Sequence, residues 1–210
     1  MNITAIKIEQ KRANYFKPVF WTVLFLMSLS VLILYDIPLA RLKSAHAHYM
    51  SIRWMLIPHI IGGLLALLIG PFQFSTRIRQ RSLKFHRVLG RVYVYSVFLA
   101  APLGMAIALY LRLSGIFIVA NLVQSGSWFV TTLAAFLTAR NRHIVQHRQW
   151  MIRSYSVTFT FILMRVFNPL PFWVHVRGKP FGVTQIVVTF LAVFIPDIVF
   201  NLKEMTSRRT

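Results

Sequence analysis

Long runs of uncharged, mostly apolar residues alternate with short basic segments along the whole chain. Four runs are free of charged residues and cover residues 19–35, 54–74, 92–111 and 113–139. Two further runs, 150–174 and 183–202, are apolar but contain a few charged side chains. A helix needs about 20 such residues to cross the hydrocarbon core of a bilayer. The pattern predicts an all-α integral membrane bundle of six transmembrane helices. The predicted helices cover residues 19–36, 54–74, 88–111, 115–138, 149–172 and 183–202 of a single domain that spans 1–210.

The first apolar run follows basic residues, as the apolar part of a signal peptide does. It is longer than the usual ~7–15 residues of such a segment. The one small-residue motif of the cleavage type, Ala45-His46-Ala47, lies well beyond its end. We therefore expect a retained first helix.

The distribution of charged residues predicts how the chain is oriented in the membrane. The chain has 24 Lys and Arg against 4 Asp and Glu, for a net charge of +20. With six helices, 17 of the 24 basic residues fall on the side that holds both termini. Basic residues concentrate in cytoplasmic loops, so both termini are predicted to be cytoplasmic. The basic residues are split among membrane flanks, which favours contact with anionic lipid headgroups over nucleic-acid binding. The chain has no cysteine, which excludes disulfides and cysteine-held metal centres.

Polar and small residues recur at helical spacing inside the apolar runs. In the second predicted helix, the stripe is His59, Gly63, Ala66, Gly70 and Gln73. Residues at steps of three and four share one face of a helix. Polar residues in membrane helices face the bundle interior, and small ones let helices approach closely. We expect this stripe to face other helices. The further polar residues expected to be buried are Tyr93, Tyr155, Arg165 and Asp197.

A similar polar sequence precedes two of the apolar runs. It reads HRVLGRVY at His86–Tyr93 and HRQWMIRSY at His147–Tyr155. Both copies begin at the same predicted depth, on parallel helices. Two histidines at one depth on two helices can hold a haem iron from both faces. Neighbouring arginines could then bind the haem propionates. The arginines in question are Arg87, Arg91, Arg148 and Arg153.

The same residues fit a simpler interpretation, in which each His-Arg pair is a basic flank that binds lipid headgroups. Arg165 also has two interpretations. It could extend outward to the membrane surface, or it could form an anion-binding site with His59. Asp197 follows Pro196, a pairing that is typical of a broken helix.

The stretch HIIGGLLALLIGPFQFSTRIRQRSLKFHRVLGRVY, together with HRQWMIRSYSVTFTFILMR, resembles a bacterial family of multi-pass membrane proteins that is catalogued as a domain of unknown function. The similarity covers roughly His59 to Arg165. The matching positions are His59, Gly70, Gln73, Phe74, Arg77, His86, Arg87, Gly90, Tyr93, His147, Trp150, Met151, Arg153, Ser154, Tyr155 and Arg165. The resemblance implies a multi-pass protein of the bacterial inner (cytoplasmic) membrane and no particular activity.

The helix order is also similar to that of the eukaryotic-type cytochromes of the b561 superfamily. That resemblance implies one haem between helices 3 and 5, at His86 and His147, and a second haem between helices 2 and 4. His59 matches the helix 2 ligand. The helix 4 histidine is missing, and Asn121 and Gln124 are the nearest polar residues. The resemblance therefore implies one complete haem site.

Three functions follow from these patterns. The first is a haem b electron-transfer protein, in effect a membrane oxidoreductase, with His86 and His147 as iron ligands and quinone near His59 and Gln73. The second is a transporter or small-molecule-binding membrane protein built around Arg165 and His59. The third is a scaffold subunit without chemistry of its own. The sequence gives no indication of oligomeric state.

Overall fold

The computed structural model describes residue 19 and residues 22–36, 50–167 and 179–207. These residues form helices and no strand, as expected for an all-α bundle. The helix at the start of the chain covers Thr22–Leu34 and runs into a short π-helix, η1 (Leu32–Asp36). The remaining helices are α3 (Arg53–Gln73), α4 (Thr76–Arg81), α5 (Leu83–Tyr110), α6 (Gly115–Arg140), α7 (Ile144–Phe167) and α9 (Lys179–Ser207).

Within the described residues, four helical segments are long and apolar enough to cross a membrane. They are Met50–Gln73, Leu83–Tyr110, Gly115–Arg140 and Phe181–Thr206. The helix Thr22–Leu34 is apolar but shorter. A helix is present in each of the six predicted regions, and four of them have the length and composition of membrane spans.

Two helices begin earlier than the apolar pattern predicts. Helix α5 begins at Leu83 instead of residue 88, because the Ser82 side chain accepts a hydrogen bond from the Phe85 amide (3.2 Å) and caps the helix. Helix α7 begins at Ile144 instead of residue 149, directly after a tight turn in which Arg142 adopts a positive φ of 62°. The first turns, Leu83–His86 and Ile144–His147, each contain two apolar and two polar residues, and each places a histidine within the helix. The predicted end of the fifth helix, at residue 172, lies outside the described residues.

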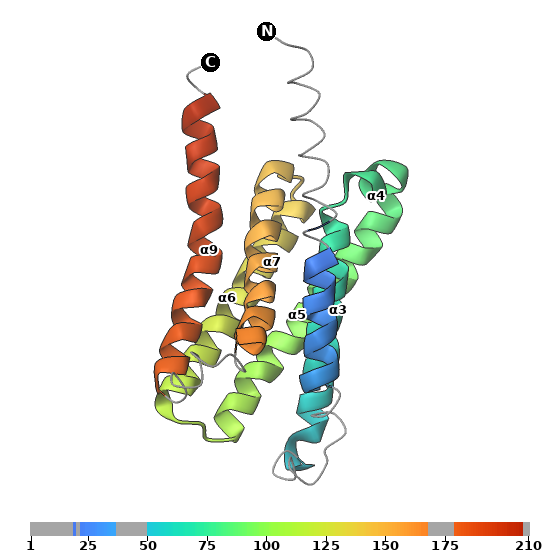
Figure 1. Cartoon of the computed structure of the whole chain (residues 1–210). Coiled ribbons are helices and arrows are strands. Elements are labelled where there is room, and N and C mark those ends of the chain that lie inside the picture. The colour runs from blue at the N-terminus through green and yellow to red at the C-terminus, as the bar shows by residue number, and fades with distance from the viewer. Residues whose placement is uncertain (1–18, 20–21, 37–49, 168–178, 208–210) are drawn as a thin grey trace.

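Four helices form a ring in which each packs against two others. Helix α5 contacts α3 and α6, and α7 contacts α6 and α3, so that α5 and α7 face each other across the ring. Helix α9 packs against α6 and α7 on the outside (Figure 1). Figure 1 shows α4, the turn between α6 and α7, and the end of α9 at one end of the bundle, which we call the α4 end.

Hydroxyl groups fill the centre of the ring. The Tyr93 hydroxyl on α5 is hydrogen-bonded to Ser154 (2.8 Å) and Thr158 (3.1 Å) on α7. The Trp128 indole N–H of α6 donates to the same Thr158 hydroxyl (2.8 Å), and Thr132 bonds Ser154 (2.7 Å). All five side chains are buried. Buried polar groups must find partners within the protein, so this network ties three helices together.

A second polar contact joins α9 to the ring. The Gln185 amide donates to the Gln124 side-chain oxygen (2.7 Å), and Gln124 in turn donates to Thr160 (2.7 Å). The sequence pattern did not identify Gln185 and Thr160 as contact residues. It identified Gln124 only as a polar residue near the position of the missing histidine in the fourth predicted helix. The available signal was the one glutamine within each of two apolar runs, Gln124 in residues 113–139 and Gln185 in residues 183–202.

The expected stripe on α3 is only partly a packing face. Ala66 is fully buried, and a side chain at Gly70 would overlap the ring of Tyr155, which confirms close approach there. Gly63 does not pack, because no atom lies within 4 Å of the position that a Cβ would take. The close approach is made instead by Gly62, whose Cβ position lies 2.8 Å from the Ser96 carbonyl oxygen. Gly63 faces other helices across a cavity, as expected, but close packing at this position was wrong, since Gly62 is the glycine that meets α5.

Helix α9 continues through Pro196 to Ser207 and is not broken there, contrary to the expectation from Pro196 and Asp197. Asp197 is instead the partner of Arg153 on α7. The Arg153 Nε donates to the Asp197 carboxylate (2.6 Å), and a second guanidinium nitrogen of Arg153 donates to the same oxygen. The guanidinium also lies over the Trp150 ring, 4.5 Å from its centroid. The ion pair between Asp197 and Arg153 therefore links α9 to α7.

Candidate functional site

The two His-Arg segments lie at the same end of the bundle, on the two helices that face each other across the ring. His86 is in the first turn of α5, and His147 is in the first turn of α7. The His147 Nδ1–H donates to the carbonyl oxygen of Ala135 on α6 (2.8 Å). In neutral imidazole this leaves the Nε2 lone pair available. Histidines that bind metals are commonly fixed by such a bond through their second nitrogen.

His86 has a different environment. Its Nδ1 is buried without a hydrogen-bond partner among the described residues, and so is the Nε2 of Gln73. Three side chains that can carry positive charge interact electrostatically with the His86 ring, namely Arg79, His147 and Arg87. The side-chain oxygen of Gln73 lies 3.2 Å from the Cβ position of Gly90, one turn after His86 on α5. Two buried nitrogen atoms that have no partner among the described residues thus occur where α3 ends and α5 begins.

The four arginines that were expected to bind haem propionates divide into two groups. Arg87, Arg91 and Arg148 are exposed at the α4 end. Arg153 is already engaged by Asp197, with a side chain that is 12% exposed. Its charge is balanced within the protein, so the structure leaves three arginines for an external anion. The buried Tyr93 and Tyr155 lie deeper in the bundle, where Tyr155 donates to the Leu67 carbonyl (3.2 Å).

His59 lies far from this end. It is six residues after the start of α3, whereas Gln73 is the last residue of that helix. Fourteen residues of helix separate them by about 21 Å at ~1.5 Å per residue. A quinone head group at Gln73 would therefore lie about one stripe length away from His59, at the other end of α3. The His59 Nδ1–H donates to the Ala100 carbonyl of α5 (2.8 Å), and its ring packs on Gly104.

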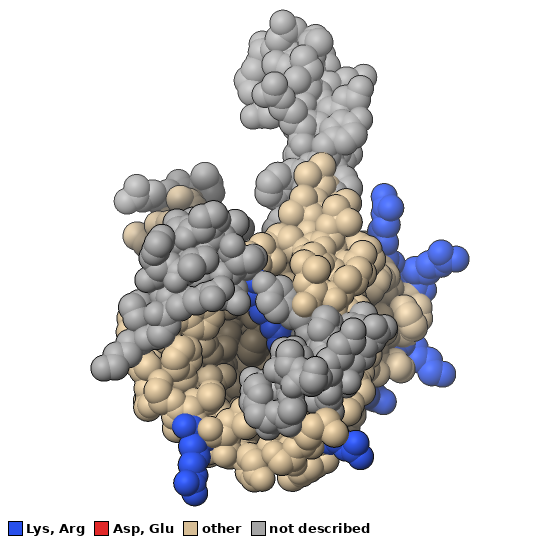
Figure 2. All heavy atoms as spheres, turned by 60° about the horizontal axis from the view of Figure 1, so that its bottom comes forward, with Lys and Arg blue, Asp and Glu red and all other residues tan. Residues whose placement is uncertain are grey.

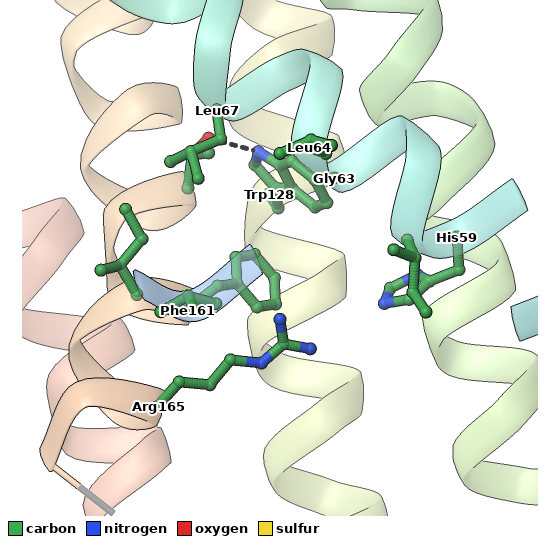
Figure 3. Close-up of a pocket in the computed structure, with 11 residues that line it drawn as sticks. His59, Gly63, Leu64, Leu67, Trp128, Phe161 and Arg165 are labelled. Carbon is green, nitrogen blue, oxygen red and sulfur yellow. Dashed lines mark hydrogen bonds between the residues drawn. The ribbon is translucent and has the colours of Figure 1, made fainter. Parts of the chain in front are cut away.

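Arg165 lines the same cavity as His59 near the opposite end of the bundle. The cavity has a volume of about 60 Å³. Its lining comes from the first helix and from α3, α6 and α7. Figure 3 shows the Arg165 and His59 side chains extending into this space from α7 and α3. Arg165 therefore points inward, and the structure brings together the two residues of the predicted anion site.

A metal site of three or more ligands is not formed by the part of the chain that the structure describes, since no group of three histidine or acidic side chains occurs there. His86 and His147 together offer two imidazole ligands. Haem is a group that takes two such ligands.

Sequence comparison gives one match. The profile of the family described as "Predicted membrane protein (DUF2306)" matches residues 55–202, more than two thirds of the chain. The search of curated proteins and the search of solved structures gave no match. The similarity to b561 cytochromes therefore remains a prediction from helix placement.

Proposed function

The chain belongs to the DUF2306 family of predicted membrane proteins, and we propose that it is a multi-pass membrane protein that carries haem b and transfers electrons. His86 and His147 would supply the two axial ligands. The observation that carries this proposal is the placement of two histidines at one end of parallel helices. The His147 ring is fixed through its Nδ1 by a backbone carbonyl. The His86 ring has a buried nitrogen that lacks a partner among the described residues.

The proposed topology has six spans with both termini in the cytoplasm of a bacterium. In addition to the four apolar spans, Thr22–Leu34 and α7 would cross the membrane within the bundle. Helix α7 is polar where it passes through the ring, because Ser154 and Thr158 bond Tyr93 there. The α4 end carries the basic residues of α4 and of the starts of α5 and α7, as the positive-inside rule requires of a cytoplasmic face.

The residues of this chain fit haem in two respects. His86 and His147 would hold the iron, and a haem held by two histidines favours electron transfer over oxygen chemistry. The exposed guanidinium groups of Arg87, Arg91 and Arg148 are suited to carboxylates such as haem propionates. The bound haem would supply one-electron redox chemistry, and the protein would hold it and exclude water.

Quinone is the proposed redox partner, because a membrane protein exchanges electrons most directly with a carrier that is dissolved in the bilayer. Gln73 is the residue placed to bind it. Its buried side-chain nitrogen lacks a partner among the described residues and can donate to a quinone carbonyl oxygen. This proposal keeps Gln73 and leaves out His59, which lies near the other end of α3.

The optical spectrum of the purified protein tests the haem proposal. The protein, supplied with haem during expression, should show Soret absorbance that shifts on reduction. His86→Ala and His147→Ala should each remove the six-coordinate spectrum. His143→Ala is the matched control, because His143 is exposed on the turn before α7 and should leave the spectrum unchanged.

A folded sample without haem absorbance would refute the proposal. So would a spectrum that survives in both His86→Ala and His147→Ala. Circular dichroism of each variant in the same detergent separates loss of haem from loss of fold.

A further inference from the structure

An apolar groove lies outside the ring, between the first helix and α9. Its volume is about 430 Å³, and residues of α7 form part of its lining together with residues of those two helices. None of the eleven lining residues is charged. Figure 2 turns the end opposite the α4 end toward the viewer, and most of the Lys and Arg side chains in this view project from the edge of the molecule. Pockets of ~300–1,000 Å³ between the helices of a bundle commonly bind small molecules, so the groove has the size of a ligand site for an uncharged group.

The groove offers few polar groups to a ligand. The Tyr155 hydroxyl donates to the Leu67 carbonyl (3.2 Å), and the Thr160 hydroxyl accepts a hydrogen bond from Gln124 (2.7 Å). Ser156 is the remaining hydroxyl of the lining, and its side chain has no hydrogen bond within the described part of the chain. A ligand in the groove therefore gains van der Waals contacts and at most one hydrogen bond to a side chain.

The groove lies at the level of the bilayer centre in the proposed topology. Helix α7 runs inward from the α4 end, and Tyr155 and Leu163 are seven and fifteen residues after Arg148. At ~1.5 Å per residue, these two positions are about 11 and 23 Å along the helix from Arg148. Arg148 marks the cytoplasmic surface in that topology, and the hydrocarbon core is about 30 Å thick. The groove therefore spans the middle of the core, which phospholipid head groups do not reach.

One side chain connects the groove with the part of α3 that carries Gln73. The Tyr155 ring lines the groove and packs against Phe74, with 5.6 Å between the ring centroids. The same ring fills the space that a side chain at Gly70 would take. Gly70 and Phe74 are three residues before and one residue after Gln73. Because Gln73 is the last residue of α3, it lies nearer to the α4 end than the groove, which extends from Tyr155 toward the middle of the membrane.

We propose that this groove binds the polyprenyl tail of the quinone, a step that rests on quinone being the redox partner under the proposed function. A polyprenyl tail is a long uncharged chain, so a head group at Gln73 directs it toward the middle of the membrane, where the groove lies. Lipid chains are as apolar as this tail, and close packing therefore binds it instead of exclusion from water. Phe159, Leu163 and Leu191 supply packing surfaces on two helices.

A quinone with a diazirine group in its prenyl tail tests the site directly. The full-length protein in lipid nanodiscs is irradiated with this probe, and the crosslinked residues are identified by mass spectrometry. We expect crosslinks to residues of α7 and α9 that line the groove, and competition by the unlabelled quinone. Ala192→Phe places a ring in the groove and should reduce labelling at least about tenfold, the effect of ~1.4 kcal/mol of lost binding. Leu202→Phe is the matched control, because Leu202 is exposed on α9 outside the groove and should leave labelling unchanged.

Quinols with and without a tail separate this site from the proposed redox activity. The KM for haem reduction is measured with a prenylated quinol and with duroquinol, which has no tail. The ratio of the first KM to the second should rise at least about tenfold in Ala192→Phe, because the lost contacts are made by the tail alone. The ratio should stay at the wild-type value in Leu202→Phe. If neither quinol reduces the protein, the proposed redox partner is refuted, and the labelling experiment decides whether the groove binds the tail.

A second variant fills the groove from the opposite wall. Ser156→Leu adds bulk on α7 and should reduce labelling as Ala192→Phe does, and thermal unfolding in detergent shows whether each variant is folded. The proposal is overturned if the prenyl probe labels no residue of the groove, or if both variants are folded and labelled like the wild-type protein. It is also overturned if a phospholipid with a diazirine in its acyl chain labels the groove and quinone does not displace it, since the groove then holds ordinary membrane lipid.

Discussion

A pair of glycine-to-alanine substitutions on α3 provides a sharp test of the packing in the ring. Gly70 and Gly63 lie seven residues apart on the same helix. A Cβ at Gly70 would overlap the Cε2 and Cδ2 atoms of the Tyr155 ring, whereas a Cβ at Gly63 would meet open space. Tyr155 is 8% exposed, and its hydroxyl donates to the Leu67 carbonyl, so the ring cannot move without losing that bond.

Overpacking of this kind costs about 1–3 kcal/mol. Alanine in place of an unhindered helical glycine adds about 0.5–1 kcal/mol of stability. The two variants should therefore differ by roughly 1.5–4 kcal/mol. For a chain of this length, each kcal/mol corresponds to about 2–4 °C in melting temperature. We expect Gly70→Ala to melt at least ~3 °C below Gly63→Ala in a thermal unfolding experiment in detergent.

A second substitution shows whether the Tyr155 ring is the cause. Tyr155→Leu removes the ring atoms that the new methyl group would overlap. In the double variant Gly70→Ala/Tyr155→Leu, the alanine should cost less than it does alone, by about 1 kcal/mol or more, as residues in contact are non-additive. Equal melting of the two alanine variants, or strict additivity in the double variant, would refute the packing described here.

Two further predictions concern the link between α7 and α9 and the topology of the chain. Asp197→Asn should lower the free energy of unfolding by about 1–3 kcal/mol, between the values typical of exposed and buried ion pairs, since the Arg153 and Asp197 side chains are 12% and 34% exposed. Unfolding of the two single variants, Asp197→Asn and Arg153→Gln, and of the double variant should show that their effects are coupled, and additive effects would contradict the ion pair. Reporter fusions after Lys43 and Gly178 should report an external location, and fusions at either terminus a cytoplasmic one; cytoplasmic signals at Lys43 and Gly178 would rule out six spans with this orientation.

The local sequence determined which segments are helices and much of which side faces inward. Apolar length predicts membrane helices because the bilayer leaves backbone groups no other partners. Tyr93, Val97 and Ala100 follow one another at steps of four and three residues, which is one face of a helix, and all three are fully buried. Ser154 and Thr158 are four residues apart on α7, and both bond Tyr93. These predictions succeed because the period of a helix is a property of the chain itself.

Helix rotation and the partner of each polar side chain depended on the tertiary structure. Gly62 and Gly63 differ in direction by about 100° on a helix, and only the packing of α3 against α5 shows that Gly62 makes the close contact while Gly63 faces a cavity. Asp197 lies 44 residues after Arg153 in the chain, so no local pattern connects them. The local sequence is equally consistent with an Arg165 side chain that extends outward to the membrane surface and with one that points into the bundle. Its position in the cavity with His59 follows from how four separate helices pack, because the depth and direction of a long side chain are set by neighbours that are distant in sequence.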